Sequence, residues 1–463
     1  MATLAKLGPV ERLTAGASDA LQRRVAGALQ ARGLTVGDRV VFSARSSGSL
    51  LSAILGARRG GIVAVVLNPD LLDHERAQLT DDADPRLVVT DADLSTLAEG
   101  PPVDLAPVPL ARPMHYTSGT TGRPKGVWSG VLTEPAARAL AAEERDLWGF
   151  AADDRHLVCS PLHHSAPIRF AAGTLLAGGE VLLLGRFDAV AARRAIAEAQ
   201  PTTTFVVPAH LQRLVAEDEP PPLDSFRLIA HAGAPCPLAV KEALIGAAPA
   251  GSVWEFYGST EGQFTACSTS EWRDRPGTVG RARPGRRLHT DADGTIWCDV
   301  PDHARFSYWR DPGRTAAAWR GAAFTVGDLG RVDDSGYLYL DGRRDDLIIS
   351  GGVNVYPVEV ERALLGGRGV VEVAVFGVDD PRWGQRVCAA VVGDVDPVEL
   401  VAHARRRLTA YKVPKQVFVV DELPRTSTGK VRRADLSGRL GLGPAGTGDL
   451  NGEGGTAARS RPG

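Results

Sequence analysis

A run of eleven residues in the first third of the chain has the composition of a phosphate-binding loop. It reads Tyr116-Thr-Ser-Gly-Thr-Thr-Gly-Arg-Pro-Lys-Gly126. Its glycines let backbone N–H groups approach an anion closely, its hydroxyls add hydrogen-bond donors, and Lys125 adds a positive charge. Because Lys125 is followed by glycine and not by Ser or Thr, the run is not a Walker A loop. This order of residues favours a loop for ATP phosphates over an ordinary glycine-rich surface loop.

Four more polar runs follow in chain order. They are Tyr257-Gly-Ser-Thr-Glu261, Gly327-Asp-Leu-Gly330, Gly342-Arg-Arg-Asp-Asp-Leu-Ile-Ile-Ser-Gly-Gly-Val-Asn-Val-Tyr-Pro357 and Pro424-Arg-Thr-Ser-Thr-Gly-Lys430. With the phosphate loop, they resemble the adenylate-forming superfamily of acyl- and aryl-CoA synthetases, luciferases and peptide-synthetase adenylation domains. The resemblance extends from roughly Asp38 to Arg433, and the motifs stand in the family's order at family-like spacing.

The resemblance implies an AMP-forming acid–thiol ligase. ATP activates a carboxylic acid to an acyl-adenylate with release of pyrophosphate, and the acyl group then passes to a thiol. The implied cofactors are ATP, Mg²⁺ and coenzyme A as the favoured thiol acceptor. The implied partners are a small carboxylic acid and CoA or an acyl carrier protein, with the chain acting as a monomer or homodimer.

Alternative functions share part of this chemistry. A stand-alone adenylating enzyme would pass the acyl group to a carrier protein, an amine or another nucleophile. A catalytically inactive relative that only binds nucleotide is the remote alternative, and the presence of the motif residues disfavours it. A P-loop phosphotransferase is disfavoured by the missing Walker Ser or Thr.

The resemblance implies specific roles for individual residues. It assigns catalysis to Thr117, Thr260, Glu261 and Lys430. It assigns ATP binding to Thr117, Ser118, Gly119, Thr120, Thr121, Gly122, Lys125, Gly233, Ala234, Pro235, Tyr257, Gly258, Ser259, Thr260, Asp328, Arg343 and Lys430.

Each role fits the chemistry of its side chain. Glu261 offers the hard carboxylate oxygen that Mg²⁺ prefers, and the resemblance makes it the metal residue. Asp328 is an acceptor with two oxygens for the two ribose hydroxyls. Arg343 has a planar guanidinium whose N–H groups can donate to ribose or phosphate oxygens. Lys430 would stabilise the charge that concentrates when a carboxylate attacks the α-phosphate.

The second half of the implied reaction needs a path for a pantetheine thiol. In the family the small C-terminal domain swings about a hinge, which corresponds to Asp345 here. The thiol-transfer loop Ser350, Gly351 and Gly352 would then enter the site, because its glycines permit close backbone approach.

A further group of residues is expected to bind the acid. The resemblance assigns substrate binding to His164, Ala232, Gly233, Phe256, Gly258, Gln263 and Phe264. This group is mostly apolar, which favours an apolar or aromatic monocarboxylate. Arg169 could pair with a second carboxylate there, but extension from a helix into solvent is the favoured role for this long side chain.

The elements that must position these residues follow from the hydrophobic pattern. From Ser18 to Trp254 short β-branched runs alternate with Ala/Leu/Arg-rich stretches, a pattern typical of βαβ units and mostly parallel sheet. After Glu261, Gly/Pro/Asp turns separate short strands. A short polar and charged segment at 341–346 is the best candidate for a domain boundary, and a small α+β region follows it.

The predicted fold class is therefore α/β. A large N-terminal domain has mostly parallel sheets flanked by helices and a small β-barrel-like subdomain, and a small mobile α+β C-terminal domain follows. The predicted boundaries are 1–344 for ATP and acid binding, 345–440 for the catalytic lysine and the thiol-transfer face, and 441–463 for a disordered tail rich in Gly, Ala, Ser and Thr.

Bulk properties exclude other classes. The 53 basic and 55 acidic side chains nearly cancel, so no nucleic-acid partner is expected. The five cysteines have no C-x-x-C spacing, which argues against a zinc site and favours a reducing cytoplasm. No apolar run is long enough for a membrane span. The Ala/Arg/Gly-rich composition hints at a bacterial source, with a role in secondary metabolism possible.

Overall fold

The computed structural model describes residues 5–7, 10–117, 125–215, 221–350, 353–425 and 431–442, and the side chains of all of these except 5–7 and 345. The chain divides into two units, Met1–Leu340 and Asp341–Gly463. Each unit has its own hydrophobic clusters. No helix in these ranges is both long enough and apolar enough to cross a membrane.

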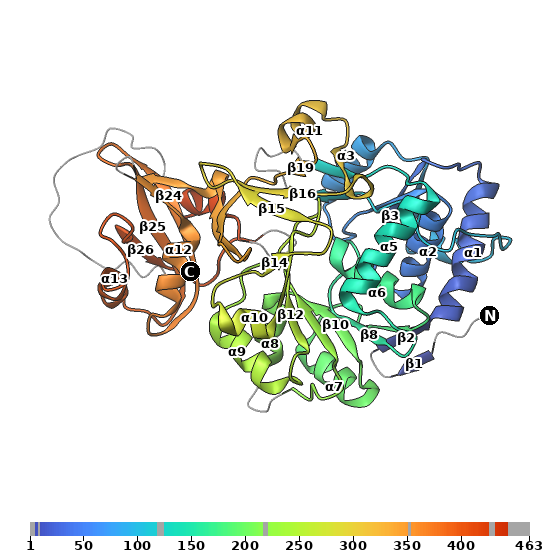
Figure 1. Cartoon of the computed structure of the whole chain (residues 1–463), viewed down its shortest axis with the longest axis horizontal. Helices are drawn as coiled ribbons and strands as arrows, with labels where there is room; N and C mark the ends of the chain where they lie inside the picture. Colours follow the sequence, from blue (N-terminus) through green and yellow to red (C-terminus); the bar gives the residue numbers. More distant parts are fainter. Residues whose placement is uncertain are drawn as a thin grey trace, which may run out of the picture. The chain divides into compact units, whose positions relative to one another are not determined.

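The first unit contains a nine-stranded sheet, shown in Figure 1. Its centre is parallel, as predicted from the alternating pattern, and consists of β9 (Glu180–Leu183), β8 (Arg155–Val158), β10 (Thr203–Val206), β11 (Leu228–His231) and β12 (Val253–Glu255). Antiparallel strands complete its two edges. They are β1 (Ala5–Leu7) and β2 (Val10–Thr14) on one side, and β13 (Thr265–Ser268) and β14 (Arg281–Ala282) on the other.

A second, wholly parallel sheet has β3 (Arg39–Ser43) between β4 (Val63–Val66) and β5 (Leu87–Thr90). Four helices share one buried cluster with strands of both sheets: α1 (Ala15–Ala31), α2 (Gly48–Arg59), α4 (Asp93–Leu97) and α6 (Ser165–Leu176). The close packing of α1 on α2 requires a glycine, because a Cβ on Gly56 would lie 2.5 Å from the carbonyl oxygen of Gln22. The remaining helices that flank the sheets are α3 (Asp73–Ala83), α5 (Glu134–Trp148), α7 (Ala189–Ala199), α8 (Pro208–Val215), α9 (Leu238–Ala247) and α10 (Thr269–Asp274).

The region after Glu261 has the short antiparallel strands that its turn-rich sequence predicts. One sheet has the order β15 (Arg287–Thr290), β16 (Ile296–Asp299), β19 (Ala323–Phe324) and β18 (Trp319–Arg320). Another joins β17 (Ser307–Tyr308), β7 (Lys125–Trp128) and β6 (His115–Thr117). β20 (Asp328–Val332) pairs with β21 (Leu338–Arg343), and α11 (Pro312–Ala318) lies between β17 and β18 in sequence.

The second unit is α+β, as predicted. Its sheet has the order β23 (Val353–Val355), β22 (Ile348–Ser350), β25 (Gly384–Gly393) and β24 (Val370–Asp380), and β26 (Gln416–Val419) pairs with β25. The helices are α12 (Pro357–Leu365), α13 (Pro397–Arg405) and α14 (Leu436–Arg439). The functional domains 1–344 and 345–440 remain predictions, and the predicted tail lies outside the described residues from 443 onward.

Candidate active site

An antiparallel hairpin carries the two ends of the predicted phosphate loop. In this hairpin Thr117 of β6 pairs with Lys125 of β7, and Tyr116 pairs with Gly126. The residues between them, 118–124, lie outside the described residues, and with them the predicted ligands Ser118, Gly119, Thr120, Thr121 and Gly122. Among the described residues, the buried side-chain oxygen of Thr117 has no hydrogen-bond partner.

A tight turn between β12 and β13 positions Glu261. The backbone N–H of Ser259 donates to the carbonyl oxygen of Gly262 at 2.8 Å, and Gly258 forms a bridge with Gln263. A Cβ on Gly258 would lie 2.8 Å from that same carbonyl oxygen, so the turn needs glycine at this position. Thr260 and Ser259, both half-buried, lie in the same turn.

Glu261 is buried and surrounded by polar partners. The hydroxyl of Tyr308 on β17 donates to its Oε1 at 2.8 Å, and the ammonium of Lys125 lies 3.3 Å from the same oxygen. Burial alone would raise the pKa of Glu261, but Lys125 and the Tyr308 hydrogen bond hold it below its usual range. The carboxylate is therefore ionised at neutral pH.

This arrangement fits the cation that the sequence implies. Mg²⁺ at ATP sites is held by one or two carboxylates together with the substrate's phosphates. Glu261 is an ionised carboxylate beside the end of the phosphate-loop hairpin. In the described ranges, no group of three or more His, Cys, Asp or Glu side chains is arranged to bind a metal ion. Such an ion would neutralise phosphate charge.

Asp328 begins β20 and is also buried. The hydroxyl of Tyr257 donates to its Oδ2, which joins two of the predicted ATP residues from motifs far apart in sequence. The ring of Tyr257 packs on Phe264 at 4.9 Å between centroids, and Phe264 packs on Phe324 at 4.9 Å. Phe264 is fully buried in this cluster, and its role in binding the acid stays a prediction.

The predicted adenine residues follow the carboxyl end of a central parallel strand. Gly233, Ala234 and Pro235 are exposed just after β11, and Gly233 has φ of 97°, a conformation that favours glycine. Ligands of open α/β sheets bind outside the carboxyl ends of strands. Ala232 is buried in an aromatic cluster with Phe256.

His231, the last residue of β11, is fully buried, and neither ring nitrogen has a hydrogen-bond partner in the described ranges. Burial lowers its pKa to about 4, so the unfolded chain binds more protons below about pH 6.5. The free energy of unfolding should therefore fall as the pH is lowered from about 6.5 to about 4. Between pH 7 and 4.5, wild type is expected to lose about 2 kcal/mol more than the His231→Leu variant.

Chemical denaturation of both proteins at the two pH values measures this difference. An equal loss in both would show that His231 does not contribute to acid sensitivity.

Arg169 does not extend into solvent, so the favoured role for its side chain was wrong. From α6 its Nη1 donates to the amide oxygen of Gln263 at 2.8 Å, and its guanidinium stacks on Phe256, 5.0 Å from the ring centroid. Its charge is retained inside the protein because Glu144 of α5 lies 3.6 Å away. His164 is the N-cap residue of the same helix, with its ring 4.3 Å from that of His163.

The remaining predicted residues belong to the second unit. Arg343 is exposed at the end of β21. Ser350 is buried at the end of β22, and its hydroxyl has no hydrogen-bond partner within the part of the chain that the structure describes. The side chain of Asp345, and all of Gly351, Gly352 and Lys430, lie outside the described residues.

Sequence reasoning missed two structural partners of the site. The first is Tyr308, whose sequence surroundings show nothing more distinctive than the aromatic pair Tyr308-Trp309. Its contact with Glu261 depends on the pairing of β17 with β7. Arg433 donates to both oxygens of Glu361 on α12 at 2.8 and 2.9 Å, and its Nη1 lies 3.1 Å from Asp346. It therefore connects the segment after Lys430 to the segment after the predicted hinge.

Comparison with known proteins defines the class. The chain belongs to the AMP-binding enzyme family, which matches residues 2–113 and 109–294, and the C-terminal domain of AMP-binding enzymes matches residues 359–430. It is an AMP-forming acid–thiol ligase of the acyl- and aryl-CoA ligase type that uses ATP.

Particular relatives cover nearly the whole chain. The indoleacetate–CoA ligase of Aromatoleum aromaticum is 32% identical over 90% of this chain and 91% of its own. The structure of ATP-bound MatB from Rhodopseudomonas palustris is 30% identical with a TM-score of 0.80, covering 92% of this chain and 93% of that one. The o-succinylbenzoate CoA synthetase of Bacillus subtilis, in complex with its acyl-adenylate OSB-AMP, is 28% identical with a TM-score of 0.81 and covers 94% of both chains.

Proposed function

We propose that this chain converts a carboxylic acid to its acyl-adenylate with Mg·ATP and then to the thioester of coenzyme A. The observation that carries the proposal is the buried, ionised Glu261 held by Lys125 and Tyr308 beside the phosphate-loop hairpin. The solved relatives that bind ATP and an acyl-adenylate support the first step, and the indoleacetate–CoA ligase supports CoA as acceptor. The five cysteines are unpaired, which supports the reducing cytoplasm as its location.

The chain's own residues have distinct tasks in this proposal. Thr117 and Lys125 would hold phosphate oxygens, Glu261 would hold the metal ion, and Asp328 would accept from the ribose hydroxyls. Lys430 stabilises the charge that develops as the substrate carboxylate attacks the α-phosphate. Attack forms the bond between the carboxylate oxygen and the α-phosphorus, and the bond to pyrophosphate breaks. The thiol sulfur then attacks the acyl carbon, losing its proton, and AMP leaves.

The test is acid-dependent exchange of labelled pyrophosphate into ATP across a panel of aryl and aliphatic acids. Exchange with some acids, followed by thioester formation when CoA is added, is the expected result. Acyl-adenylate formation without thioester would show that the acceptor is a carrier protein or an amine. No exchange with any acid, in protein that binds ATP, would contradict the proposal.

A variant of Asp328 probes the proposed ribose contact. Asp328→Ala removes a charged acceptor, and hydrogen bonds to charged groups are worth about 1.5–3 kcal/mol. The kcat/KM for ATP should therefore fall by about 10- to 100-fold. Tyr257→Phe, which removes only the donor that contacts this carboxylate, is the control and should have a smaller effect. An unchanged kcat/KM in Asp328→Ala would contradict the assignment.

A further inference from the structure

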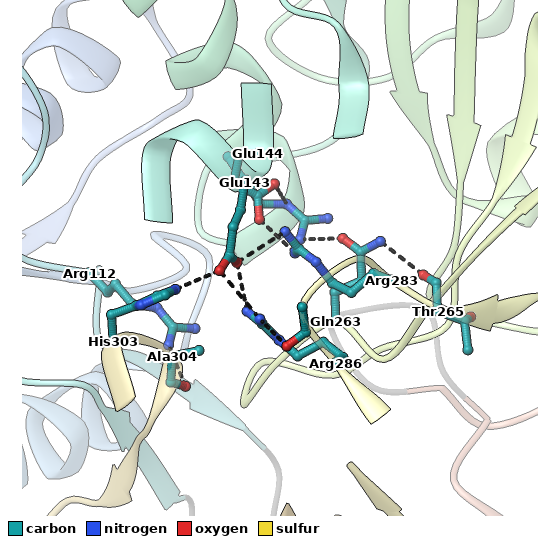
Figure 2. Close-up of polar contacts among 11 residues, drawn as sticks. Arg112, Glu143, Glu144, Gln263, Thr265, Arg283, Arg286, His303 and Ala304 are labelled. Atoms are coloured by element: carbon teal, nitrogen blue, oxygen red, sulfur yellow. Dashed lines mark hydrogen bonds and ion pairs between the residues drawn. The ribbon is translucent and has the colours of Figure 1, made fainter. Parts of the chain in front are cut away.

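A group of charged side chains lies where α5, α6 and the loop after β14 meet, as Figure 2 shows in part. Glu143 and Glu144 come from α5, Arg169 from α6, and Arg283 and Arg286 from the loop. Arg283 donates to Glu144 at 2.7 Å and Arg286 donates to Glu143 at 2.9 Å. The side chains of both arginines are almost completely buried, with exposed fractions of 3% and 4%.

The charges in this group do not balance. Arg112 adds a fourth guanidinium, and the four arginines share two glutamates, which leaves two positive charges in excess within the group. Burial and repulsion from the other arginines lower the pKa of Arg112 to about 10, although Glu144 acts in the opposite direction. Burial would raise the pKa of Glu144, but Arg169 and Arg283 hold it below its usual range. A buried charge without a partner is costly, so this group favours an anion.

Arg169 is the member that reaches the residues assigned to the acid. One of its nitrogens donates to Gln263, and its guanidinium lies over Phe256. Its buried Nε faces Glu144 at 3.6 Å, and 22% of the side chain is exposed. A guanidinium has five N–H donors, so donors remain for a ligand after the contact with Gln263.

We infer that the acid substrate is a dicarboxylic acid whose second carboxylate binds Arg169. The inference rests on the proposed adenylation, and it replaces the expected apolar or aromatic monocarboxylate. A carboxylate matches the fork of a guanidinium and neutralises one of the two excess charges. The carboxylate to be activated cannot supply this charge throughout the reaction, because it becomes an uncharged acyl group in the adenylate.

Matched pairs of acids test the inference on the wild-type protein. Terephthalate and its monomethyl ester, and adipate and its monomethyl ester, share a carbon skeleton, but in each ester a methyl group replaces the second negative charge. In acid-dependent pyrophosphate exchange, kcat/KM for a diacid should exceed that for its ester by about 10- to 100-fold. Esters used as well as diacids would overturn the inference. No exchange with any acid, diacids included, would overturn the proposed function and the inference with it.

Variants of Arg169 test whether this residue causes the preference for diacids. Arg169→Gln should bring the ratio of kcat/KM for diacid to kcat/KM for ester close to one, mainly by raising KM for the diacid. Arg169→Lys should restore part of the preference because it retains the charge. The control is Arg138→Gln, an exposed arginine of α5 that pairs with Glu134, which should leave the preference unchanged. An equal loss for diacid and ester in Arg169→Gln would overturn the inference.

Discussion

Replacing Lys430 by alanine is expected to lower acid-dependent pyrophosphate exchange by about 10²–10³-fold. Two anions, the carboxylate and the α-phosphate, come together in the adenylation step. An ammonium between them stabilises the charge as it develops, and alanine cannot replace it. Exchange at saturating ATP and acid measures the effect on kcat.

Two controls separate this role from a general loss of folding. Lys415→Ala, which removes an exposed lysine of the same unit, should exchange as wild type does. Thioester formation from a synthetic acyl-adenylate should persist in Lys430→Ala, because that step has no carboxylate attack on phosphate. Full exchange activity in Lys430→Ala would remove this lysine from the proposed mechanism.

Replacing Lys241 by methionine is expected to lower the free energy of unfolding by about 3–5 kcal/mol. Lys241 of α9 is buried, donates to Glu255 at 2.6 Å and lies over the ring of Trp272. Methionine has a similar length but leaves the carboxylate of Glu255, at the end of β12 and only 12% exposed, without its cation. Urea denaturation followed by tryptophan fluorescence measures the change.

The matched control is Arg194→Met, because Arg194 and Glu198 form an exposed pair on α7. Its effect should be within about 1 kcal/mol. The double variant Lys241→Met/Glu255→Gln should recover part of the loss, since no unpaired charge remains. If Lys241→Met and Arg194→Met lowered the free energy of unfolding equally, burial of the Lys241–Glu255 pair would contribute nothing to stability.

Local patterns were enough to predict the main architecture. Short β-branched runs such as the one at 203–206 form the parallel strands, and the turn-rich region after Glu261 forms short antiparallel strands. The small α+β region after 346 was predicted for the same reason. Each of these depends on hydrophobic period and turn residues that lie close together in sequence.

Long-range pairing could not be predicted in this way. Tyr308 contacts Glu261 only because β17 pairs with β7, whose residues are about 180 positions earlier. Arg169 was expected in solvent, since a single arginine on a helix gives no sign of a carboxylate on another helix. The contact of Tyr257 with Asp328 likewise depends on tertiary structure.

The contacts of Arg433 have a mechanical consequence. The bridge between Arg425 and Val431 joins the residues on either side of the undescribed stretch 426–430, and Arg433 contacts Glu361 of α12 as well as Asp346. Asp346 and α12 are therefore linked by a side chain that follows Val431 by two positions. If the backbone turned at Asp345, we expect Asp346, α12 and Arg433 to move together, and Arg433→Ala should weaken that coupling.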